Sequence, residues 1–206
     1  LLLCIFQIAL TADENKEFSI ELEDLYDQDL AVKDLKITPF DDELTAEELV
    51  EKLGFGWNLG NTLDAFQSVG KNEGLLSEIS WGNPQTTEEM IDVLVSKGFK
   101  AIRIPVTWHN HFVDKHYTIS PEWMLRVKEI VNWCIKKDLY VILNTHHDNA
   151  AFTNSTLDYG VGYYPLAKDL PESERFLYNV WKQIATAFNN GYDHHLIFEG
   201  MNEPRM

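Results

Sequence analysis

The residues best suited to chemistry stand near the end of the chain, after an apolar run at residues 196–198. This run predicts a short buried strand, and Asn202, Glu203 and Pro204 follow it. A carboxylic acid at the end of a strand, beside an amide and before a rigid proline, is suited to protonating a leaving group at a fixed position. A single glutamate before a proline is more often a solvated turn residue. Polar residues also follow the earlier predicted strands, and this recurrence favours a catalytic role over a turn role. We therefore predict that Glu203 is a catalytic acid.

Polar side chains also follow the apolar runs at residues 55–59 and 139–145, which we predict to be strands. These side chains are Asn61, Asp64, His146, His147 and Asp148. Asn and Asp commonly hydrogen-bond the local backbone in such loops, so a turn role is open for Asn61 and Asp64. Two histidines and an aspartate can bind a metal, and one histidine can instead activate a nucleophile. The residues alone give Asp148 no specific role.

An arginine interrupts the remaining predicted strand, residues 99–106. The guanidinium of Arg103 needs an acceptor there, because an unpaired buried charge is strongly unfavourable. An internal structural ion pair would satisfy it, and so would the carboxylate of an active site. We identify no obvious partner in this chain and therefore expect the partner beyond residue 206.

Two further histidines, His109 and His111, have the spacing of side chains on one face of a strand, which permits a metal site. No carboxylate or third ligand follows in matching register, so we do not favour a metal there. We therefore expect no metal and no other cofactor.

Two long polar loops, residues 66–85 and 149–171, carry aromatic side chains that suit contact with sugars. The first contains Trp81, for which stacking on a pyranose and packing beneath the loop are equally favoured. The second contains Tyr159, Tyr163 and Tyr164, for which packing within the loop is favoured over a sugar platform.

Helical patterns separate the predicted strands. They comprise a first helix with a cap at Thr45 and an end at Gly54, a helix at 87–97, one that begins at Ser120 and Pro121, and one at 172–189. Strand and helix thus alternate, which predicts right-handed β/α units and a parallel sheet. The expected fold class is α/β, a (β/α)8 TIM barrel.

The apolar positions of these helices predict which faces are buried. On the helix at 87–97 they are Met90, Val93 and Leu94. On the next helix they are Trp123, Val127, Ile130, Val131 and Cys134, and Trp133 is also expected to pack. On the last helix they are Phe176, Val180, Ile184 and Phe188.

Length limits how much of a barrel is present. A complete barrel needs roughly 250 residues, whereas the pattern here starts near residue 55 of a 206-residue chain. We expect residues 44–206 to be the N-terminal half of a catalytic barrel, truncated after about its fourth strand. Half a barrel exposes two sheet edges and apolar helix faces, which predicts an inactive and poorly stable fragment.

The charge of the chain is −16 and is unevenly placed. Residues 13–51 hold fifteen Asp and Glu against three Lys, and so account for most of it. We do not expect nucleic acids or acidic lipid surfaces as partners, because binding them requires clustered Lys and Arg. A neutral polysaccharide meets no such objection.

The first residues predict a targeting segment. Residues 1–12 are apolar, too short to span a bilayer and followed by an abrupt polar stretch, as in the end of a partial signal peptide. A buried strand or helix is the alternative. Residues 13–43 are acidic and predict a linker or lead-in, with a small β element open at 18–25. Loss of Cys4 with the signal would leave Cys134 without a disulfide partner.

Five segments together resemble glycoside hydrolase family 5, and most closely its subfamily 4. They are residues 56–65 (GWNLGNTLDA), 81–84 (WGNP), 103–108 (RIPVTW), 142–148 (ILNTHHD) and 198–204 (FEGMNEP). The resemblance covers about residues 44–206. It implies an endo-β-1,4-glucanase that retains anomeric configuration and acts through two carboxylates about 5 Å apart.

Residue roles follow from the resemblance at the matching positions. Glu203 matches the acid/base, Asn202 the donor to the sugar 2-hydroxyl, and His146 the active-site histidine. Arg103 matches the residue that keeps the nucleophilic carboxylate ionised. The nucleophile itself is implied to be a glutamate on a later strand, beyond this sequence, and donation by Glu203 requires burial or a nearby charge.

Substrate binding is implied for Asn61, on the non-reducing side of the cleaved bond, for His147, and for Trp81. The partner is a β-glucan polysaccharide or oligosaccharide, and the protein is expected to be secreted, extracellular and monomeric when complete. Other activities of the family remain open: xyloglucanase, lichenase, mannanase and xylanase. Two further alternatives are a non-catalytic carbohydrate-binding remnant and a metal-dependent hydrolase built on the histidines.

Overall fold

The computed structural model describes residues 44–67, 71–149, 162–164, 166–188 and 191–204. Its helices are α2 (Ala46–Leu53), α3 (Glu88–Ser96), α4 (Pro121–Lys136) and α5 (Leu170–Phe188), with 3-10 helices η2 (Gly74–Ile79) and η3 (His109–His111). Its strands are β1 (Gly56–Asn58), β2 (Ala101–Ile104), β3 (Tyr140–Asn144) and β4 (Leu196–Glu199). The predicted signal segment 1–12, the lead-in 13–43 and Tyr159 lie outside the described residues.

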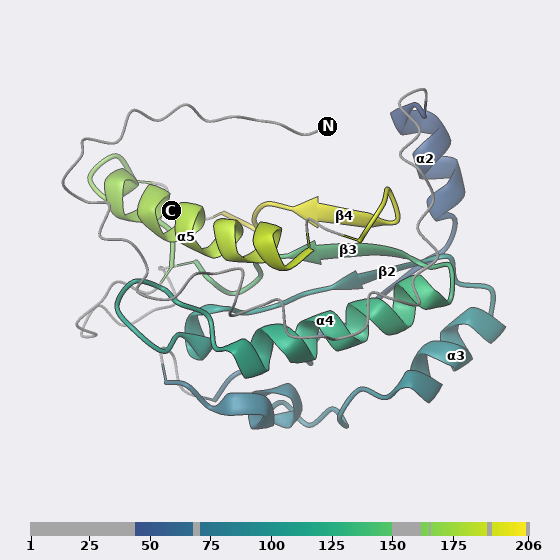
Figure 1. Ribbon diagram of the computed structural model, residues 1–206, viewed down its shortest axis with the longest axis horizontal. Coiled ribbons are helices and arrows are strands. Elements are labelled where there is room, and N and C mark those ends of the chain that lie inside the picture. Colours follow the sequence, from purple (N-terminus) through teal and green to yellow (C-terminus); the bar gives the residue numbers. More distant parts are fainter. Residues whose placement is uncertain (1–43, 68–70, 150–161, 165, 189–190, 205–206) are drawn as a thin grey trace.

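The four strands form one parallel sheet in the order β1-β2-β3-β4. A helix lies between each pair of consecutive strands, so the predicted β/α alternation and α/β class are confirmed. Figure 1 shows α5, α4 and α3 succeeding one another beside the sheet, with α2 standing apart. All four strands run the same way, and their carboxyl ends therefore meet at one edge.

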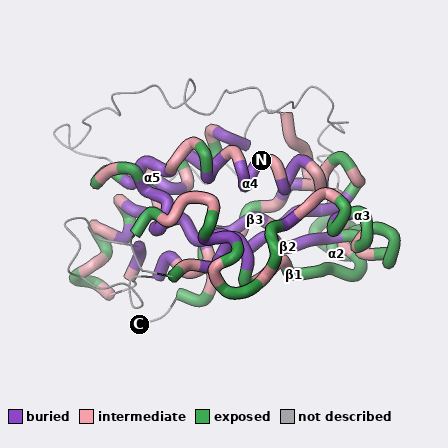
Figure 2. Tube along the Cα trace, turned by 90° about the horizontal axis from the view of Figure 1, so that it is seen from below, coloured by how far each residue is buried: buried purple, intermediate pink, exposed green. Residues whose placement is uncertain are grey.

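Burial is concentrated on the sheet face that the helices cover. Ile102, Ile104, Val141 and Leu143 are 0% exposed and occupy alternate positions of β2 and β3. Figure 2 shows this burial continuing along α4, while β1 and α2 are exposed. The opposite sheet face presents the other strand positions, which include polar side chains.

The predicted faces of the two long helices are confirmed. All five apolar residues expected on α4 and all four expected on α5 are buried. Trp133 is partly buried against the same core. Cys134 is a buried free thiol whose pKa is raised to about 12 by burial, as expected of a packing residue rather than a reactive one.

The prediction for α3 is partly wrong. Ile91 is buried and Leu94 is partly buried, whereas Met90 and Val93 are exposed. Four apolar residues within five positions cover more than one side of a helix, and only the row through Ile91 and Leu94 packs inward. The sequence pattern alone does not indicate which row of apolar residues is buried.

The limits of α2 and the start of α4 follow their sequence signals. Thr45 and Glu48 form a capping box at the start of α2, and Gly54 ends the helix with a φ of 51°. Ser120 stands at the N-cap of α4 and Pro121 begins the helix, as predicted, although the Ser120 side chain makes no capping hydrogen bond. In the described part of the chain, no helix is both long and apolar enough to span a membrane.

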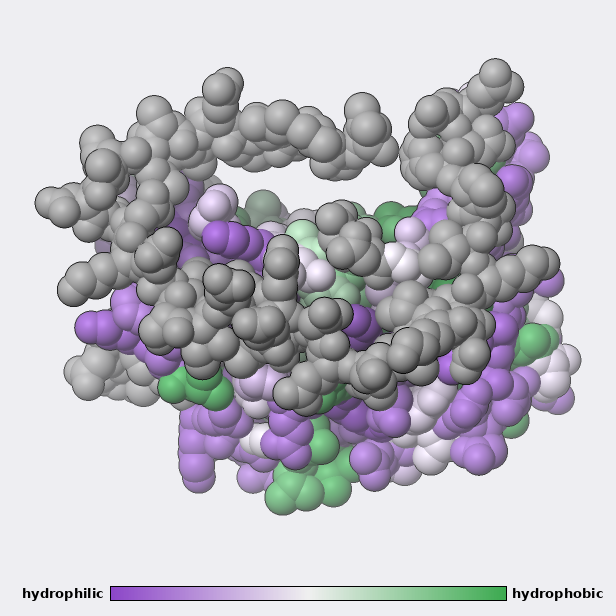
Figure 3. All heavy atoms as spheres, in the orientation of Figure 1, coloured by the Kyte–Doolittle hydropathy of each residue, from purple (hydrophilic) through white to green (hydrophobic). Residues whose placement is uncertain are grey.

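The outer strands are more exposed than predicted. Phe55 and Trp57 at β1 are 83% and 48% exposed, and Phe198 in β4 is 44% exposed. The strand predicted at 196–198 is confirmed, but its burial is wrong except for Leu196, because β4 lies at one edge of the described sheet. Trp181 of α5 packs edge-on against Phe198. Elsewhere the surface in Figure 3 is mainly hydrophilic, with separate hydrophobic patches.

Candidate active site

Parallel pairing brings Arg103, a predicted site residue, together with three polar residues that were not predicted, at the carboxyl edge of the sheet. Asn58 pairs with Arg103 between β1 and β2, and Asn144 pairs with Glu199 between β3 and β4. These four side chains share the sheet face away from the helices. The strands thus deliver one polar cluster from residues that are up to 141 positions apart in sequence (Asn58 to Glu199).

Arg103 is at the centre of this cluster. Its Nε and Nη2 donate to Glu199 Oε2 and Oε1 at 2.7 and 2.6 Å, a two-point pairing of guanidinium and carboxylate. Nη2 also donates to Asn202 Oδ1 at 3.0 Å, and Nη1 to Asn58 Oδ1 at 3.1 Å. The prediction that Arg103 lacks a partner within the chain is therefore wrong. The arginine side chain is long enough to reach across β3 to β4, which strand periodicity alone does not reveal.

This pairing shifts the ionisation of both groups. The hydrogen bonds from Arg103 hold the pKa of Glu199 below its ordinary value, although partial burial opposes this. The hydrogen bond to Glu199 in turn raises the pKa of Arg103. Glu199 is consequently an anion and a hydrogen-bond acceptor at neutral pH.

Asn144, at the end of β3, links three parts of the site. Its Oδ1 accepts from the Val106 backbone N–H at 3.2 Å. Its Nδ2 lies 3.1 Å from Glu199 Oε1 and 3.1 Å from His146 Nδ1. Asn144 is fully buried, and the sequence alone did not single it out, because it lies inside the predicted strand at 139–145 and not after its end.

The two predicted histidines converge on Asp64. His146 Nε2 and His147 Nε2 are 3.9 and 3.5 Å from Asp64 Oδ2. Burial and the neighbouring His147 lower the pKa of His146 to about 4. Asp64 is buried and its Oδ1 accepts from the Thr62 backbone N–H, so it combines the predicted turn role with a place in the site.

Glu203 lies at a sharp turn beyond β4, with a φ of 40°. The preceding Asn202 anchors this turn: its backbone N–H donates to Thr145 O at 2.9 Å, and its carbonyl accepts from Tyr163 Oη at 2.8 Å. Glu203 is exposed, so of the two expected means of raising its pKa, burial and a nearby negative charge, burial is not present among the described residues. Tyr163 is 2% exposed and packs, as predicted.

Trp81 both packs and presents a surface. Its indole Nε1 donates to Phe66 O at 2.6 Å, and its ring centroid is 5.5 Å from each of the rings of Phe66 and His147. Trp81 nevertheless remains 42% exposed. Asn61 has a φ of 59° and is exposed. Its carbonyl accepts from Asn83 Nδ2, which places it beside the loop that carries Trp81. Both residues remain accessible to a ligand at this edge.

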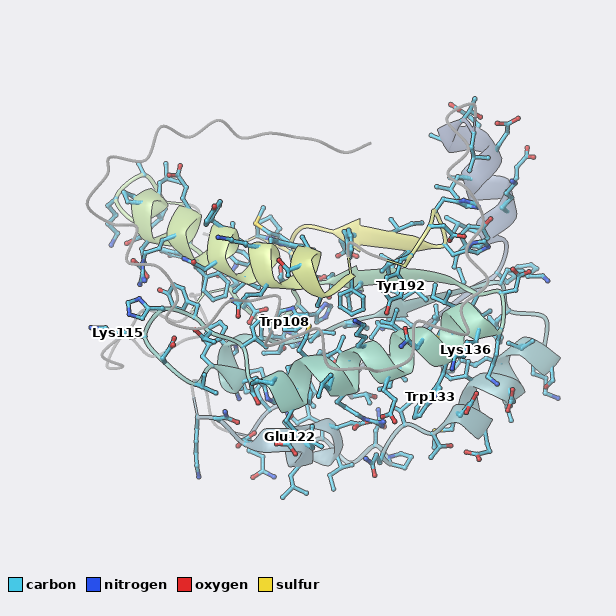
Figure 4. All side chains as sticks on the ribbon, in the orientation of Figure 1. Trp108, Lys115, Glu122, Trp133, Lys136 and Tyr192 are labelled. Carbon is cyan, nitrogen blue, oxygen red and sulfur yellow. The ribbon has the colours of Figure 1, made fainter. Side chains whose placement is uncertain are left out.

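Asp148, which had no predicted role, clamps two loops together. Its Oδ1 accepts from the backbone N–H groups of Trp108 and His109 at 2.9 and 2.8 Å, and lies 3.0 Å from His109 Nδ1. Trp108, labelled in Figure 4, is fully buried and donates from Nε1 to Asn144 O. Asp148 therefore fixes the loop that carries His146.

His109 and His111 do not share a strand face, the arrangement that their spacing permitted but that we did not favour. Both residues lie in the 3-10 helix η3. His111 stacks on Trp123 with ring centroids 3.5 Å apart, and its Nε2 is 3.2 Å from Ser77 Oγ. Burial and the neighbouring His109 lower the pKa of His111 to about 3.

We expect His111 to make the fold sensitive to acid. Its folded pKa is below the ordinary value of about 6.5, so the unfolded chain binds the proton more readily. The contribution of neutral His111 to the free energy of unfolding is therefore complete above about pH 6.5. It falls by up to about 1.4 kcal/mol per pH unit as the pH decreases towards the folded pKa. Urea denaturation at pH 7, 6, 5 and 4 should show a shallower decline for His111→Gln than for wild type. The exposed His116→Gln serves as control, and equal slopes for wild type and His111→Gln would contradict the assignment.

Comparison with known proteins matches this arrangement to one family. A sequence model described as cellulase (glycosyl hydrolase family 5) matches residues 63–206. Endoglucanase B of Ruminococcus albus is 48% identical over 164 residues, which cover 79% of this chain and 36% of that protein. The chain thus spans about a third of the length of this relative.

Solved structures agree with the sequence relatives. A GH5-4 broad specificity endoglucanase from Ruminococcus champanellensis with bound cellotriose has a TM-score of 0.71 and 42% identity, over 82% of this chain and 46% of that one. A glycoside hydrolase 5 lichenase from Caldicellulosiruptor sp. F32, in complex with cellotetraose, has a TM-score of 0.69 and 39% identity, over 82% and 43%. The four-stranded sheet corresponds to part of such a barrel-shaped catalytic domain.

Proposed function

Since the chain belongs to glycoside hydrolase family 5, the cellulase family, we propose that the protein containing it is a retaining endo-β-1,4-glucanase. The supporting observation is the cluster at the carboxyl edge, where Arg103, His146 and Asn202 gather around Glu199 and the turn to Glu203. In barrels of this kind the chemistry lies at that edge. Relatives described as endoglucanases, one of them with bound cellotriose, favour a β-glucan as substrate.

In the proposed mechanism Glu203 protonates the leaving oxygen and later deprotonates the attacking water. Asn202 hydrogen-bonds the 2-hydroxyl of the sugar being cleaved, an interaction that strengthens as the ring gains positive charge. A further carboxylate of the complete barrel attacks the anomeric carbon, giving a covalent intermediate and net retention. Arg103 supplies positive charge near that carboxylate and keeps it ionised.

Substrate binding is assigned to the residues that remain accessible beside this cluster. Trp81 offers its exposed indole to the apolar face of a pyranose, and Asn61 and His147 offer hydrogen bonds to sugar hydroxyls. We also propose that the protein is secreted, because its polymeric substrate is extracellular and because residues 1–12 resemble the end of a signal peptide.

The activity is tested on a protein that carries the complete catalytic domain. We expect it to cleave cellotetraose and carboxymethyl cellulose internally, and proton NMR of the first products should show the β-anomer before mutarotation. Lichenan, xyloglucan, mannan and xylan serve as parallel substrates. Cleavage of mannan or xylan alone would reject the glucanase assignment, and initial release of the α-anomer would reject the retaining mechanism.

A further inference from the structure

We propose that Asn144 and Glu199 are positioning residues that fix His146 in one tautomer, with its proton on Nε2, and hold Arg103 in one orientation. The pair lies on adjacent strands, where Asn144 and Glu199 are register partners. The catalytic consequence of this arrangement rests on the proposed glucanase function. The tautomer itself is a property of the folded chain and is tested without activity.

The orientation of the Asn144 amide is fixed by its neighbours. The Val106 backbone N–H can only donate, so the amide atom that faces it must be the oxygen. The other amide atom faces Glu199 Oε1, which can only accept because the hydrogen bonds from Arg103 keep that carboxylate ionised. Both neighbours therefore require Nδ2 on the side of Glu199 and His146.

The amide orientation determines the state of the imidazole. An amide Nδ2 donates and never accepts, so His146 Nδ1, 3.1 Å away, must accept. In a neutral imidazole one nitrogen accepts and the other carries the proton. His146 therefore carries its proton on Nε2, and its low pKa of about 4 keeps the ring neutral at working pH.

The Nε2–H of His146 makes no hydrogen bond to its neighbour Asp64. It lies 3.9 Å from Asp64 Oδ2, which is beyond hydrogen-bond distance, so the donor is available to a ligand. We assign it to donation to a sugar hydroxyl. Asp64, His146 and His147 also lie close enough together to hold a cation, but ligation through Nε2 would require its proton to move to Nδ1, which faces the N–H donor of Asn144. The same inference therefore predicts no divalent metal bound through His146.

Glu199 holds the arrangement together because one oxygen serves two partners. Its Oε1 accepts from Arg103 Nη2 at 2.6 Å and from Asn144 Nδ2 at 3.1 Å. Removal of its charge would loosen both contacts at once. The guanidinium would lose its two-point anchor, and the amide would keep only the Val106 N–H to fix its orientation.

Nitrogen-15 NMR of the histidine side chains in the 206-residue chain tests the inference. At pH 7 the wild type should show His146 with a protonated Nε2 and an unprotonated Nδ1. In Asn144→Asp an acceptor replaces the donor, so we expect the proton to move to Nδ1 and the pKa of His146 to rise by at least about one unit. In Glu199→Gln the Val106 N–H still orients the amide, so we expect the Nε2–H tautomer to persist while Arg103 loses one of its two acceptor oxygens. The matched control is Asn132→Asp, a buried amide of α4 whose Oδ1 accepts from Tyr192 Oη.

Two results would overturn the inference: a wild-type spectrum with the proton on Nδ1, which requires no variant to fold, or an unchanged spectrum in a folded Asn144→Asp chain. Tight binding of Zn²⁺ to the wild type that is lost in His146→Gln would also contradict it.

In the complete catalytic domain, Asn144→Asp should lower kcat more than it raises KM and should shift the acidic limb of the pH profile. If the spectra agree but the complete enzyme does not cleave β-glucans, the proposed function fails and the tautomer assignment stands.

Discussion

Replacing Glu203 with Gln in the complete catalytic domain is expected to lower kcat on cellotetraose by about 100-fold to 10,000-fold, the usual contribution of general acid–base catalysis. Gln keeps the size and polarity of the side chain but cannot donate the proton that the leaving sugar oxygen requires. The turn should be unaffected, because it is anchored through the backbone N–H and carbonyl of Asn202, which bond Thr145 O and the Tyr163 hydroxyl. Steady-state kinetics on cellotetraose measures the effect.

A substrate with an acidic leaving group distinguishes loss of the acid from general damage. An activated aryl cellobioside needs little protonation, so formation of the covalent intermediate should persist in Glu203→Gln, while added azide should speed its breakdown. Glu174→Gln, at an exposed position on α5, is the matched control and should retain full activity. Equal losses on both classes of substrate would assign Glu203 to structure and not to proton transfer.

Sequence periodicity predicted the elements that are buried on one side only. The apolar rows of α4 and α5 have a single favourable packing side, so the predicted residues are the buried ones. At α3 the apolar residues surround more of the helix, and at β4 the strand lies at an edge. In both places exposure depends on which neighbouring element is present, and a local pattern does not contain that information.

The same limit applies to the site. The ends of the strands indicated Asn61, His146 and Glu203, because parallel strands bring such residues to one edge whatever their separation. The partner of Arg103 was missed because Glu199 is 96 residues away and two strands across. A carboxylate paired in register with Asn144 was the available signal, but reading it requires the pairing of β3 with β4, which the sequence does not state.

A buried ion pair away from the site gives the largest expected effect on stability. Glu78, in η2, is 0% exposed, and its two oxygens accept from Arg126 Nη2 and Nε of α4, both at 2.9 Å. Glu78 Oε1 also accepts from the Thr86 backbone N–H, and Arg126 Nη2 donates to the carbonyl of Thr86. These bonds attach both ends of the segment that carries Trp81 to the same helix.

Replacing Arg126 with Met should lower the free energy of unfolding by about 3–5 kcal/mol, because the Glu78 carboxylate stays buried without its counter-charge. Lys137→Met, also on the α4 side, is the control: its partners Glu88 and Asp92 are 46% and 59% exposed, so water can solvate them and the loss should be about 1 kcal/mol or less. Urea denaturation of the three proteins measures both values.

The double replacement Arg126→Met with Glu78→Met separates the charge from the packing. Two apolar side chains of similar length remove the buried charge altogether, so we expect the double variant to regain much of the stability lost in the single one. The segment that carries Trp81 would then have lost its hydrogen bonds to α4. The fluorescence of Trp81 should become more accessible to quenching by iodide even where stability is restored, because the hydrogen bonds to Thr86 that orient this segment are gone. If the single variant costs less than about 1 kcal/mol, the pair contributes orientation but little stability.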